Sequence, residues 1–452
     1  MRRALFSLVL ALVLGMSWVV SGALPDDPKP SAKPATDDEI VPLAGTTDDS
    51  EEAPVTVTVV PTAREMDPVA VPRILCRAGE SGICATIRET LVRDLTLSAF
   101  FSVLPEQSYL ADMDNETLKR TKWEDWFNVG ARYLIKVEVT GAGADHDITY
   151  RLYDISSKTL LAVEGQDASG IPTGKVVPRT HAFVNELIRT ITGMPGLFGS
   201  TLLYSAKSSK TTRAVYAIGI DGTGRRTLAG GDTLNMFPSM VGGALIYTSF
   251  KAGKPDIYLN GSRITHDGRH YRGARLSPDG GVLAVAADDG GQSDIFLMSV
   301  KGKILRNLTK SGADEVSPSW SPDGQRIAFV SSRTGGPQIY VMGRDGSGWR
   351  RVTFAGNYNS TPDFGPDGRI VFAGMDGGHS DIFVTDLEGN IQRITQDQGS
   401  NKDPAFSPDG RHIVFVSSRD SGWRIWLSTA DGRYQFPVTK RAGGYSTLSW
   451  AK

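Results

Sequence analysis

A four-residue phrase recurs at nearly constant spacing along the second half of the chain. Its copies, Ser-Pro-Asp-Gly or once Gly-Pro-Asp-Gly, start at residues 277, 321, 365 and 407, so the steps are 44, 44 and 42 residues. Proline presets φ for a tight turn, aspartate bonds to nearby backbone amides, and glycine accepts positive φ. Each phrase therefore predicts a hairpin turn, and the repeat length is typical of one β-propeller blade.

The residues between these turns predict four strands in each blade. In the unit from Ser317 to Phe354, one strand ends at Trp320 and others cover 326–331, 338–342 and 350–353. An aliphatic and an aromatic residue mark the third strand at 215–216, 257–258, 295–296, 339–340, 382–383 and 425–426. An aliphatic residue paired with threonine marks the fourth at 227–228, 264–265, 308–309, 352–353, 394–395 and 438–439. Both counts predict six blades.

The two ends of this repeat region indicate how the ring closes. The segment from Ser200 to Ser205 starts the region with a second strand, whereas Thr447 to Trp450 matches an innermost strand. We therefore expect the C-terminal strand to complete the first blade, which would remove exposed sheet edges. Residues 197–452 are predicted to be a six-bladed β-propeller closed in this way.

The N-terminal residues are typical of an exported protein. Arg2 and Arg3 precede an apolar run over 4–20, and small residues stand at Ser21 and Ala23. This pattern predicts a signal peptide over 1–23 that is cleaved after Ala23. A retained membrane anchor is the alternative, although the run is shorter than the ~20 residues of a usual span. No direct membrane insertion of the mature chain is expected.

An acidic, proline-rich segment follows over residues 24–53. It has nine acidic residues against Lys29 and Lys33, five prolines and few large apolar side chains. Such a composition cannot bury enough apolar surface to offset its ordering entropy, so we predict a solvated tether. An acidic recognition arm is the alternative. The whole chain is nearly neutral, with 49 basic and 50 acidic residues, which does not favour a nucleic-acid partner.

Residues 54–196 predict a separate α/β domain, because alternating and helical patterns are mixed there. Strands are expected at 55–60, 69–75, 133–140, 148–155 and 159–164, and helices at 85–101, 122–131 and from about 175 to Gly193. Trp123 and Trp126 are expected to lie in the core of this domain. Cys76 and Cys84 predict a disulfide, since two sulfurs without a nearby histidine make a poor zinc site.

The sequence contains no recognisable catalytic motif. There is no Gly-x-Ser-x-Gly elbow and no phosphate-binding loop. His266 and His270 are four residues apart, but Gly268 between them argues against a helical metal pair. We expect neither a cofactor nor a metal, and no enzyme activity. A catalytic propeller related to peptidases or lyases, and a propeller that binds peptidoglycan, are the alternatives.

A recognition surface is expected where the loops between an outer strand and the next inner strand gather around the channel. Aromatic, cationic and amide side chains there are suited to binding a protein partner. For any single residue, an ordinary solvated loop is the alternative. The candidates in these loops are His270, Tyr271, Arg272, Glu315, Asn359, Ser360, Lys402, Asp403 and Tyr445.

The order of these parts resembles the TolB family of the Tol-Pal system, from about Val55 to Lys452. This resemblance rests on the signal peptide, on the α/β domain with its junction at Ile191–Phe198, and on the six units with Ser-Pro-Asp-Gly turns. The resemblance implies a non-enzymatic, monomeric periplasmic adaptor. It would bind the lipoprotein Pal on the propeller and TolA through the N-terminal region, supporting outer-membrane integrity and constriction during division.

The resemblance also assigns a site. A histidine of the family's Pal interface matches His270, and its neighbour Ala274 is carried over with it. Two departures are visible: Val316 and Ser317 stand where the family has a Thr-Glu pair, with Glu315 adjacent, and the mature N-terminus is the acidic tether. The TolA-binding role would then fall on residues 55–60, whose alternating pattern could add to a partner's sheet, or on the tether.

Overall fold

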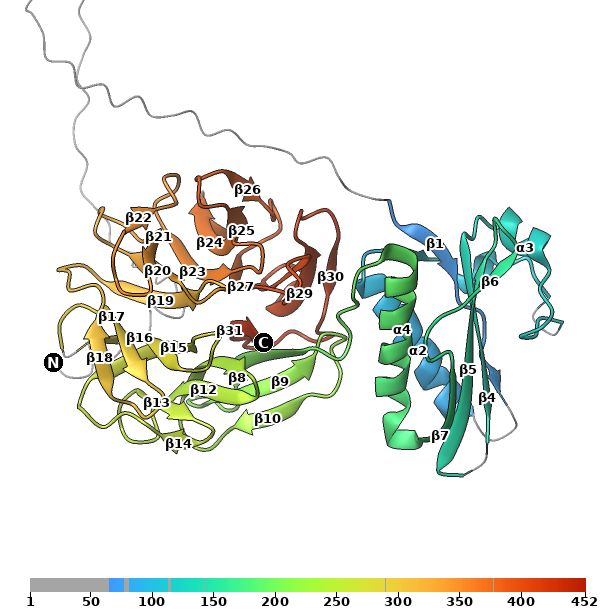
Figure 1. Cartoon of the computed structure of the whole chain (residues 1–452), viewed down its shortest axis with the longest axis horizontal. Helices are drawn as coiled ribbons and strands as arrows, with labels where there is room; N and C mark the ends of the chain where they lie inside the picture. Colours follow the sequence, from blue (N-terminus) through green and yellow to red (C-terminus); the bar gives the residue numbers. More distant parts are fainter. Residues whose placement is uncertain (1–64, 77–80, 113–114, 142, 289, 377) are drawn as a thin grey trace, which may run out of the picture. The chain divides into compact units, whose positions relative to one another are not determined.

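The described residues form two kinds of sheet: one mixed sheet near the N-terminus and six antiparallel sheets after it (Figure 1). The computed structural model describes residues 65–76, 81–112, 115–141, 143–288, 290–376 and 378–452. The predicted signal peptide, the tether and the strand expected at 55–60 lie outside the described residues. An α/β domain followed by a six-bladed propeller is the predicted fold class, and it is confirmed.

The N-terminal sheet has the strand order β3-β1-β4-β5-β6, with β2 also paired to β4 and β7 to β5. β1 runs parallel to β3 and β4, whereas β4 and β5 are antiparallel. Its strands are β1 (Asp67–Ala70), β2 (Leu75–Cys76), β3 (Phe101–Val103), β4 (Tyr133–Thr140), β5 (Asp145–Asp154), β6 (Thr159–Leu161) and β7 (Asp167–Pro172). Its helices are α2 (Ser81–Leu97), α3 (Trp123–Asn128) and α4 (Val176–Thr192), with short 3₁₀ turns at Glu106–Ser108 and Thr173–Lys175.

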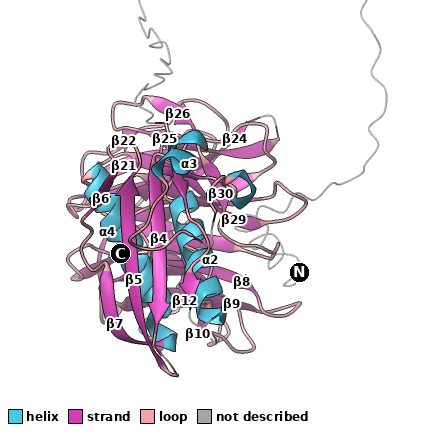
Figure 2. Ribbon diagram, turned by 90° about the vertical axis from the view of Figure 1, so that its right-hand side faces the viewer, coloured by secondary structure: helices cyan, strands magenta, loops and turns pink. Residues whose placement is uncertain are grey.

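Helices α2 and α4 lie side by side on one face of this sheet (Figure 1), behind β4 and β5 in Figure 2. Ile87, Leu91 and Leu95 of α2 recur four residues apart and are fully buried. Helix α4 ends at Gly193, which adopts the left-handed conformation with φ of 72°. A buried apolar stripe on each helix therefore holds both helices on the sheet.

Several predicted bounds in this domain differ from the structure. Helix α2 begins four residues before the expected start at 85 and ends before Phe101, which instead opens β3. The strand expected at 69–75 is split into β1 and β2, because Pro72 has no amide hydrogen to donate to a ladder. Trp126 is fully buried, as expected, whereas Trp123 is half-buried.

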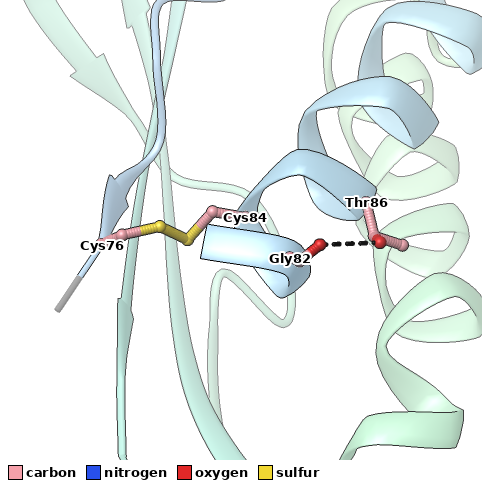
Figure 3. Close-up of a disulfide and its surroundings, with 4 residues drawn as sticks. All are labelled: Cys76, Gly82, Cys84 and Thr86. Carbon is pink, nitrogen blue, oxygen red and sulfur yellow. Dashed lines mark hydrogen bonds between the residues drawn. A yellow bond between two sulfur atoms is a disulfide. The ribbon is translucent and has the colours of Figure 1, made fainter. Parts of the chain in front are cut away.

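Cys76 and Cys84 form the predicted disulfide, with their Cα atoms 6.4 Å apart (Figure 3). Cys76 ends β2 and Cys84 lies in the first turn of α2. In the same turn, the hydroxyl of Thr86 donates to the carbonyl of Gly82 at 2.9 Å. The covalent bond thus ties the start of the helix to the sheet on which the helix packs.

The propeller consists of six four-stranded sheets, each antiparallel throughout. The first contains β10 (Arg226–Ala229), β9 (Arg213–Gly219), β8 (Thr201–Lys207) and β31 (Ser446–Trp450). The second contains β11 (Asn235–Val241), β12 (Ala244–Ser249), β13 (Asp256–Leu259) and β14 (Ser262–Arg263), and the third β15 (His270–Leu276), β16 (Val282–Asp288), β17 (Asp294–Ser299) and β18 (Ile304–Asn307).

The remaining three blades follow the same plan from the innermost to the outermost strand. The fourth contains β19 (Glu315–Trp320), β20 (Arg326–Ser331), β21 (Gln338–Gly343) and β22 (Arg350–Arg351). The fifth contains β23 (Asn359–Phe364), β24 (Ile370–Asp376), β25 (His379–Thr385) and β26 (Ile391–Arg393), and the sixth β27 (Asn401–Phe406), β28 (His412–Ser417), β29 (Arg424–Thr429) and β30 (Gln435–Pro437).

Each Ser-Pro-Asp-Gly phrase forms the hairpin turn that the sequence predicts. In the third blade, the amide of Gly281 donates to the Asp279 carboxylate at 3.0 Å, and the amide of Val282 donates to the Ser277 hydroxyl at 3.1 Å. Gly280 has φ of 71°. The hydrogen bonds from Ser277 and from the turn amides lower the pKa of Asp279 to about 2. The turn therefore satisfies several of its polar groups itself, and Arg344 of the fourth blade adds an ion pair to Asp279 at 3.0 Å.

The aliphatic-threonine pair of each outer strand also has a physical role. In the fourth blade, the amide of Ile339 donates to the Thr353 hydroxyl at 2.8 Å, and that hydroxyl donates to the Gln338 side chain at 2.8 Å. The same bond from a third-strand amide to a threonine recurs at Thr265, Thr309, Thr395 and Thr439. The repeated threonine thus fastens the outermost segment of a blade to its third strand.

The ring closes through the pairing of the last strand with the first one of the propeller. β31 runs antiparallel to β8, with Ser446 opposite Ser205 and Trp450 opposite Leu202. Beyond the strand, the amide of Lys452 donates to the carbonyl of Met240 at 3.0 Å. Trp450 is 2% exposed. The predicted closure is therefore present, and it buries apolar surface as well as pairing a sheet edge.

Deletion of residues 445–452 is expected to lower the thermal midpoint of the propeller strongly. The deletion removes the inner strand of one blade and exposes the backbone edge of β8 along with the apolar groups that Trp450 covers. Differential scanning calorimetry of the purified chain measures the midpoint. A shorter deletion of residues 451–452, which keeps β31, is the control and should cause a much smaller change. Equal midpoints for the full-length chain and the longer deletion would contradict the role of the closure.

The described residues belong to one compact unit of the chain, and polar contacts join the α/β domain to the propeller. Arg93 of α2 donates to three propeller carbonyls, those of Asp221 at 2.9 Å, Pro437 at 3.0 Å and Val438 at 2.7 Å. Beside it, Nδ1 of His181 on α4 lies 2.6 Å from the Asp94 carboxylate. Nε2 of His181 lies 3.7 Å from Asp221. Two helices, the first blade and the sixth blade therefore meet at a buried charged cluster.

Protonation of this cluster differs from that of an unfolded chain. Burial raises the pKa of Asp94 to about 6, although the hydrogen bond from His181 opposes the rise. Burial alone would lower the pKa of His181, but its hydrogen bond with Asp94 and the charges of Asp94 and Asp221 raise it. The folded protein thus retains protons that the unfolded chain releases at about pH 4 from Asp and about pH 6.5 from His. Stability from both groups is present at low pH and is lost as the pH rises through the folded pKa values.

The thermal midpoint is therefore expected to fall as the pH rises from 5 to 8, and Asp94→Asn should flatten this dependence. The substitution removes the carboxylate that titrates near pH 6 and that raises the pKa of His181. Midpoints measured by circular dichroism across this pH range test the prediction. Asp232→Asn, an exposed site with the same change of charge, is the control. An Asp94→Asn variant as pH-dependent as the unmodified protein would contradict it.

Candidate partner-binding site at the propeller channel

Each innermost strand contains a β-bulge at the same position. The register shifts in all six strands, between the second and the fifth residue in five of them and between the first and the fourth in β31. One residue within each shift is left-handed, with φ between 50° and 115°, and these residues are Phe237, Gly273, Ser317, Thr361, Asp403 and Thr447. Proline follows in four blades, where its missing amide hydrogen suits a bulge. The bulges therefore place one strained residue per blade in a ring.

These six residues line the central channel, which has a cavity volume of about 60 Å³ at this level. Arg275 and Asp363 also line it. Arg275 donates to the carbonyl of Pro238 at 3.1 Å, and the Asp403 carboxylate accepts from the amide of Thr447 at 2.9 Å. Desolvation lowers the pKa of Arg275, while the charges of Asp363 and Asp403 oppose that shift. The channel wall is thus polar and rigidly hydrogen-bonded, and it has little room for a ligand.

His270 begins the innermost strand of the third blade and is accessible at the channel rim. Its side chain is 50% exposed, and Nδ1 lies 3.3 Å from the Asp288 carboxylate. Arg272 forms an ion pair with the other oxygen of Asp288 at 2.9 Å and also lines the channel. Asp288, itself 3% exposed at its side chain, therefore orients two candidate residues at once. A partner could contact an imidazole and a guanidinium here without moving the backbone.

Tyr271 and Ala274 lie beneath this rim. Tyr271 is fully buried, and its hydroxyl donates to Asp267 at 3.0 Å. Burial, reinforced by Asp267, raises the pKa of Tyr271. Ala274 is 3% exposed but lies on the channel wall. Both residues support the rim from below, and only Ala274 touches the channel.

Glu315 and Asn359, which the sequence also placed among the contact residues, are buried between blades. Glu315 has no exposed surface and accepts hydrogen bonds from Ser311 at 2.7 Å and from Ser331 at 2.8 Å. Burial raises its pKa against the effect of these bonds. Asn359 donates to Gln338 at 2.9 Å. Glu315 and Asn359 were expected in loops, but each begins an inner strand. Their buried side chains are thus polar joints between adjacent blades.

The remaining candidates are partly accessible. The ammonium of Lys402 lies 4.3 Å from the centre of the Trp423 ring, and Tyr445 contacts Tyr204 edge-to-face at 5.3 Å. Ser360 donates to the carbonyl of Ala373 at 3.4 Å, and Asp403 belongs to the bulge ring. Arg272, Ala274 and Asp403 therefore line the channel cavity together, and His270 begins the strand that contains Arg272 and Ala274. Arg275 and Asp363 were not predicted from the sequence. The residue-proline pair that recurs in four blades precedes Asp363 and was an available signal for it, whereas Arg275 follows Gly273 and Ala274 and had no such signal.

Within the described part of the chain, no three His, Cys, Asp or Glu residues are placed to hold a metal ion together. No helix among the described residues is long and apolar enough to cross a membrane.

Two family models match the chain, and they follow the two kinds of sheet. The TolB beta propeller domain matches residues 188–452, and the TolB amino-terminal domain matches residues 55–161. The chain belongs to the TolB family. The resemblance deduced from its turns and its order of parts is thereby confirmed.

Curated TolB relatives align mainly with part of the chain. The Tol-Pal system protein TolB of Anaeromyxobacter sp. strain K is 35% identical over 285 residues, which are 60% of this chain and 63% of that protein. The one of Desulfosudis oleivorans is 31% identical over 257 residues, or 54% and 58% of the two chains. The alignments thus span less than two thirds of these relatives.

A solved TolB structure supports the fold over most of the chain. The crystal structure of TolB from Acinetobacter baumannii superposes with a TM-score of 0.73 and 21% sequence identity. The match covers 86% of this chain and 97% of that one. The TolB fold therefore accounts for both the amino-terminal domain and the propeller.

Substitutions at Glu315 and His270 should separate internal joints from accessible rim residues in this TolB protein. Glu315→Ala leaves Ser311, Ser331 and Arg333 without their buried acceptor, and we expect a loss of about 2–3 kcal/mol in the free energy of unfolding. His270→Ala, at an exposed side chain, should change it by less than about 0.5 kcal/mol. Urea unfolding followed by tryptophan fluorescence measures both. A stable Glu315→Ala variant would show that the residue is not a structural joint.

Proposed function

We propose that this chain is a periplasmic, non-enzymatic adaptor of the Tol-Pal system. In this role it binds the lipoprotein Pal through the channel face of the propeller and TolA through its N-terminal region. The two contacts support outer-membrane integrity and constriction during cell division. Family membership supports this proposal, since the curated relatives bear the name Tol-Pal system protein TolB.

The observation that carries the Pal site is the arrangement of His270 and Arg272 on one buried carboxylate. Asp288 holds both side chains within 3.3 Å, on a strand whose next residue is left-handed glycine, Gly273, with φ of 115°. A side chain whose orientation is fixed before binding loses little entropy when a partner contacts it. The site therefore has the properties of a binding hot spot: an accessible polar anchor, a rigid support and a concave surface beside it.

The rest of the proposal concerns export, the tether, the division into two domains and the TolA contact. Export through a signal peptide over 1–23 would place the mature chain in the periplasm. The acidic segment over 24–53 would act as a tether, and residues 54–196 and 197–452 would be the two domains. TolA would bind at the tether or at residues 55–60, whose alternating valines and threonines are suited to adding a strand to a partner's sheet.

Binding of Pal is expected to weaken by about 2 kcal/mol, or roughly thirtyfold in Kd, in His270→Ala. Isothermal titration calorimetry with purified Pal measures the affinity. His379→Ala, which removes another exposed histidine in the fifth blade, is the matched control and should bind normally.

Two outcomes would contradict different parts of the proposal. Full-strength binding by His270→Ala would remove this residue from the interface while leaving Pal as the partner. An unmodified chain that does not bind Pal at all would remove the partner, provided that circular dichroism shows it to be folded.

A further inference from the structure

A second cleft lies between the third and fourth blades, away from the channel. Its cavity volume is about 690 Å³. It is formed by the end of β18 and the loop that follows, by Arg333 after β20, and by the turn before β22 that contains Asp345 and Trp349. Nothing in the proposed adaptor function uses this cleft.

Cations predominate in the cleft. Arg306, Lys310 and Arg333 line it, against one lining carboxylate, Asp345. Arg306 and Lys310 are exposed, and neither side chain makes an ion pair or hydrogen bond with another described residue. After the hydrogen bonds from Ser347, the charge of Arg306 contributes to the lowered pKa of Asp345. The cleft therefore has excess positive charge that the surrounding protein does not neutralise.

Arg333 is held in place beneath these two cations. Its guanidinium lies 3.5 Å from the centre of the Trp349 ring, and its Nε donates to Ser331 at 3.2 Å. Its other contact, the buried carboxylate of Glu315, is 3.6 Å away. At the corresponding position of the sixth blade, Arg419 instead donates to Asn401 and to Gln435. Arg333 thus has a fixed orientation and fewer internal acceptors than its counterpart.

The cleft also adjoins an open sheet edge. β18 is the outermost strand of the third blade, so one side of its backbone is unpaired within that sheet. Its last residues, Arg306 and Asn307, line the cleft together with Ser311. An extended peptide can use both the backbone groups of such an edge and neighbouring side chains.

We propose that this cleft binds an acidic peptide segment of a partner protein. The ligand's carboxylates would contact Arg306, Lys310 and Arg333, and its amides would meet the open edge of β18. A peptide is favoured over an anionic glycan because Arg333 already covers a face of the Trp349 ring. The indole N–H is also occupied, since it donates to the carbonyl of Gly346 at 2.9 Å. A sugar would need that ring face to stack.

Fluorescence anisotropy with a labelled octaglutamate peptide tests the proposal on the full mature chain at low ionic strength. We expect Arg306→Gln/Lys310→Gln to raise the Kd at least about tenfold, because two unpaired cations are lost. Lys301→Gln/Lys303→Gln is the matched control. It removes the same charge from two exposed positions of the same blade outside the cleft, and should change the Kd less than about twofold.

The binding site itself can be located by zero-length carbodiimide cross-linking of the same peptide, followed by mass spectrometry. Lys310 should be cross-linked, whereas Lys301 and Lys303 should not. Equal loss of affinity in both double variants, or cross-links spread evenly over surface lysines, would overturn the proposal. Binding of octaglutamine as tight as that of octaglutamate would also overturn it, as would tighter cleft-dependent binding of a sulfated oligosaccharide. Thermal midpoints of both variants show whether the fold is retained.

Discussion

Pairing of β31 with β8 is the constraint on which the propeller depends. A blade is a small, twisted sheet that buries its two faces against its neighbours, so six of them are stable together only if the circle has no open side. The first blade is assembled from strands that are 241 residues apart at the Ser205–Ser446 contact. That one antiparallel ladder converts a row of sheets into a ring and positions the bulges around a common axis.

The ring of bulges explains why a polar channel face can be rigid. Left-handed residues in a strand cost free energy, and such strain persists only where the surroundings hold it. Here proline follows the strained residue in four blades, and threonine or aspartate side chains bond across the joints. Glu315 and Asn359 belong to this internal framework, while His270 and Arg272 stand on top of it. Buried polar groups thus hold the accessible residues in a fixed geometry.

Much of the architecture could be predicted from sequence because each blade repeats the same local chemistry. The Ser-Pro-Asp-Gly turn and the aliphatic-threonine pair satisfy their own hydrogen bonds, so their positions fixed the number of strands and the closing strand. The site was harder to predict. A polar residue at a strand start has the same appearance in sequence whether it faces solvent, like His270, or accepts buried hydrogen bonds, like Glu315. That distinction depends on the neighbouring blade, which periodicity does not reveal. For the same reason, the split between β1 and β2 and the cleft beside Trp349 had no clear signal.

The closing strand has a consequence for the order of events during biogenesis. Ribosomes make β31 after all other described strands, so the edge of β8 stays unpaired until β31 has been made. The amino-terminal sheet has no such dependence, since all its strands and helices precede residue 193. While the chain is being made, the blades can form only an open arc with one unsatisfied side. Chaperone binding or proteolysis would therefore act on this nascent arc until the final residues emerge.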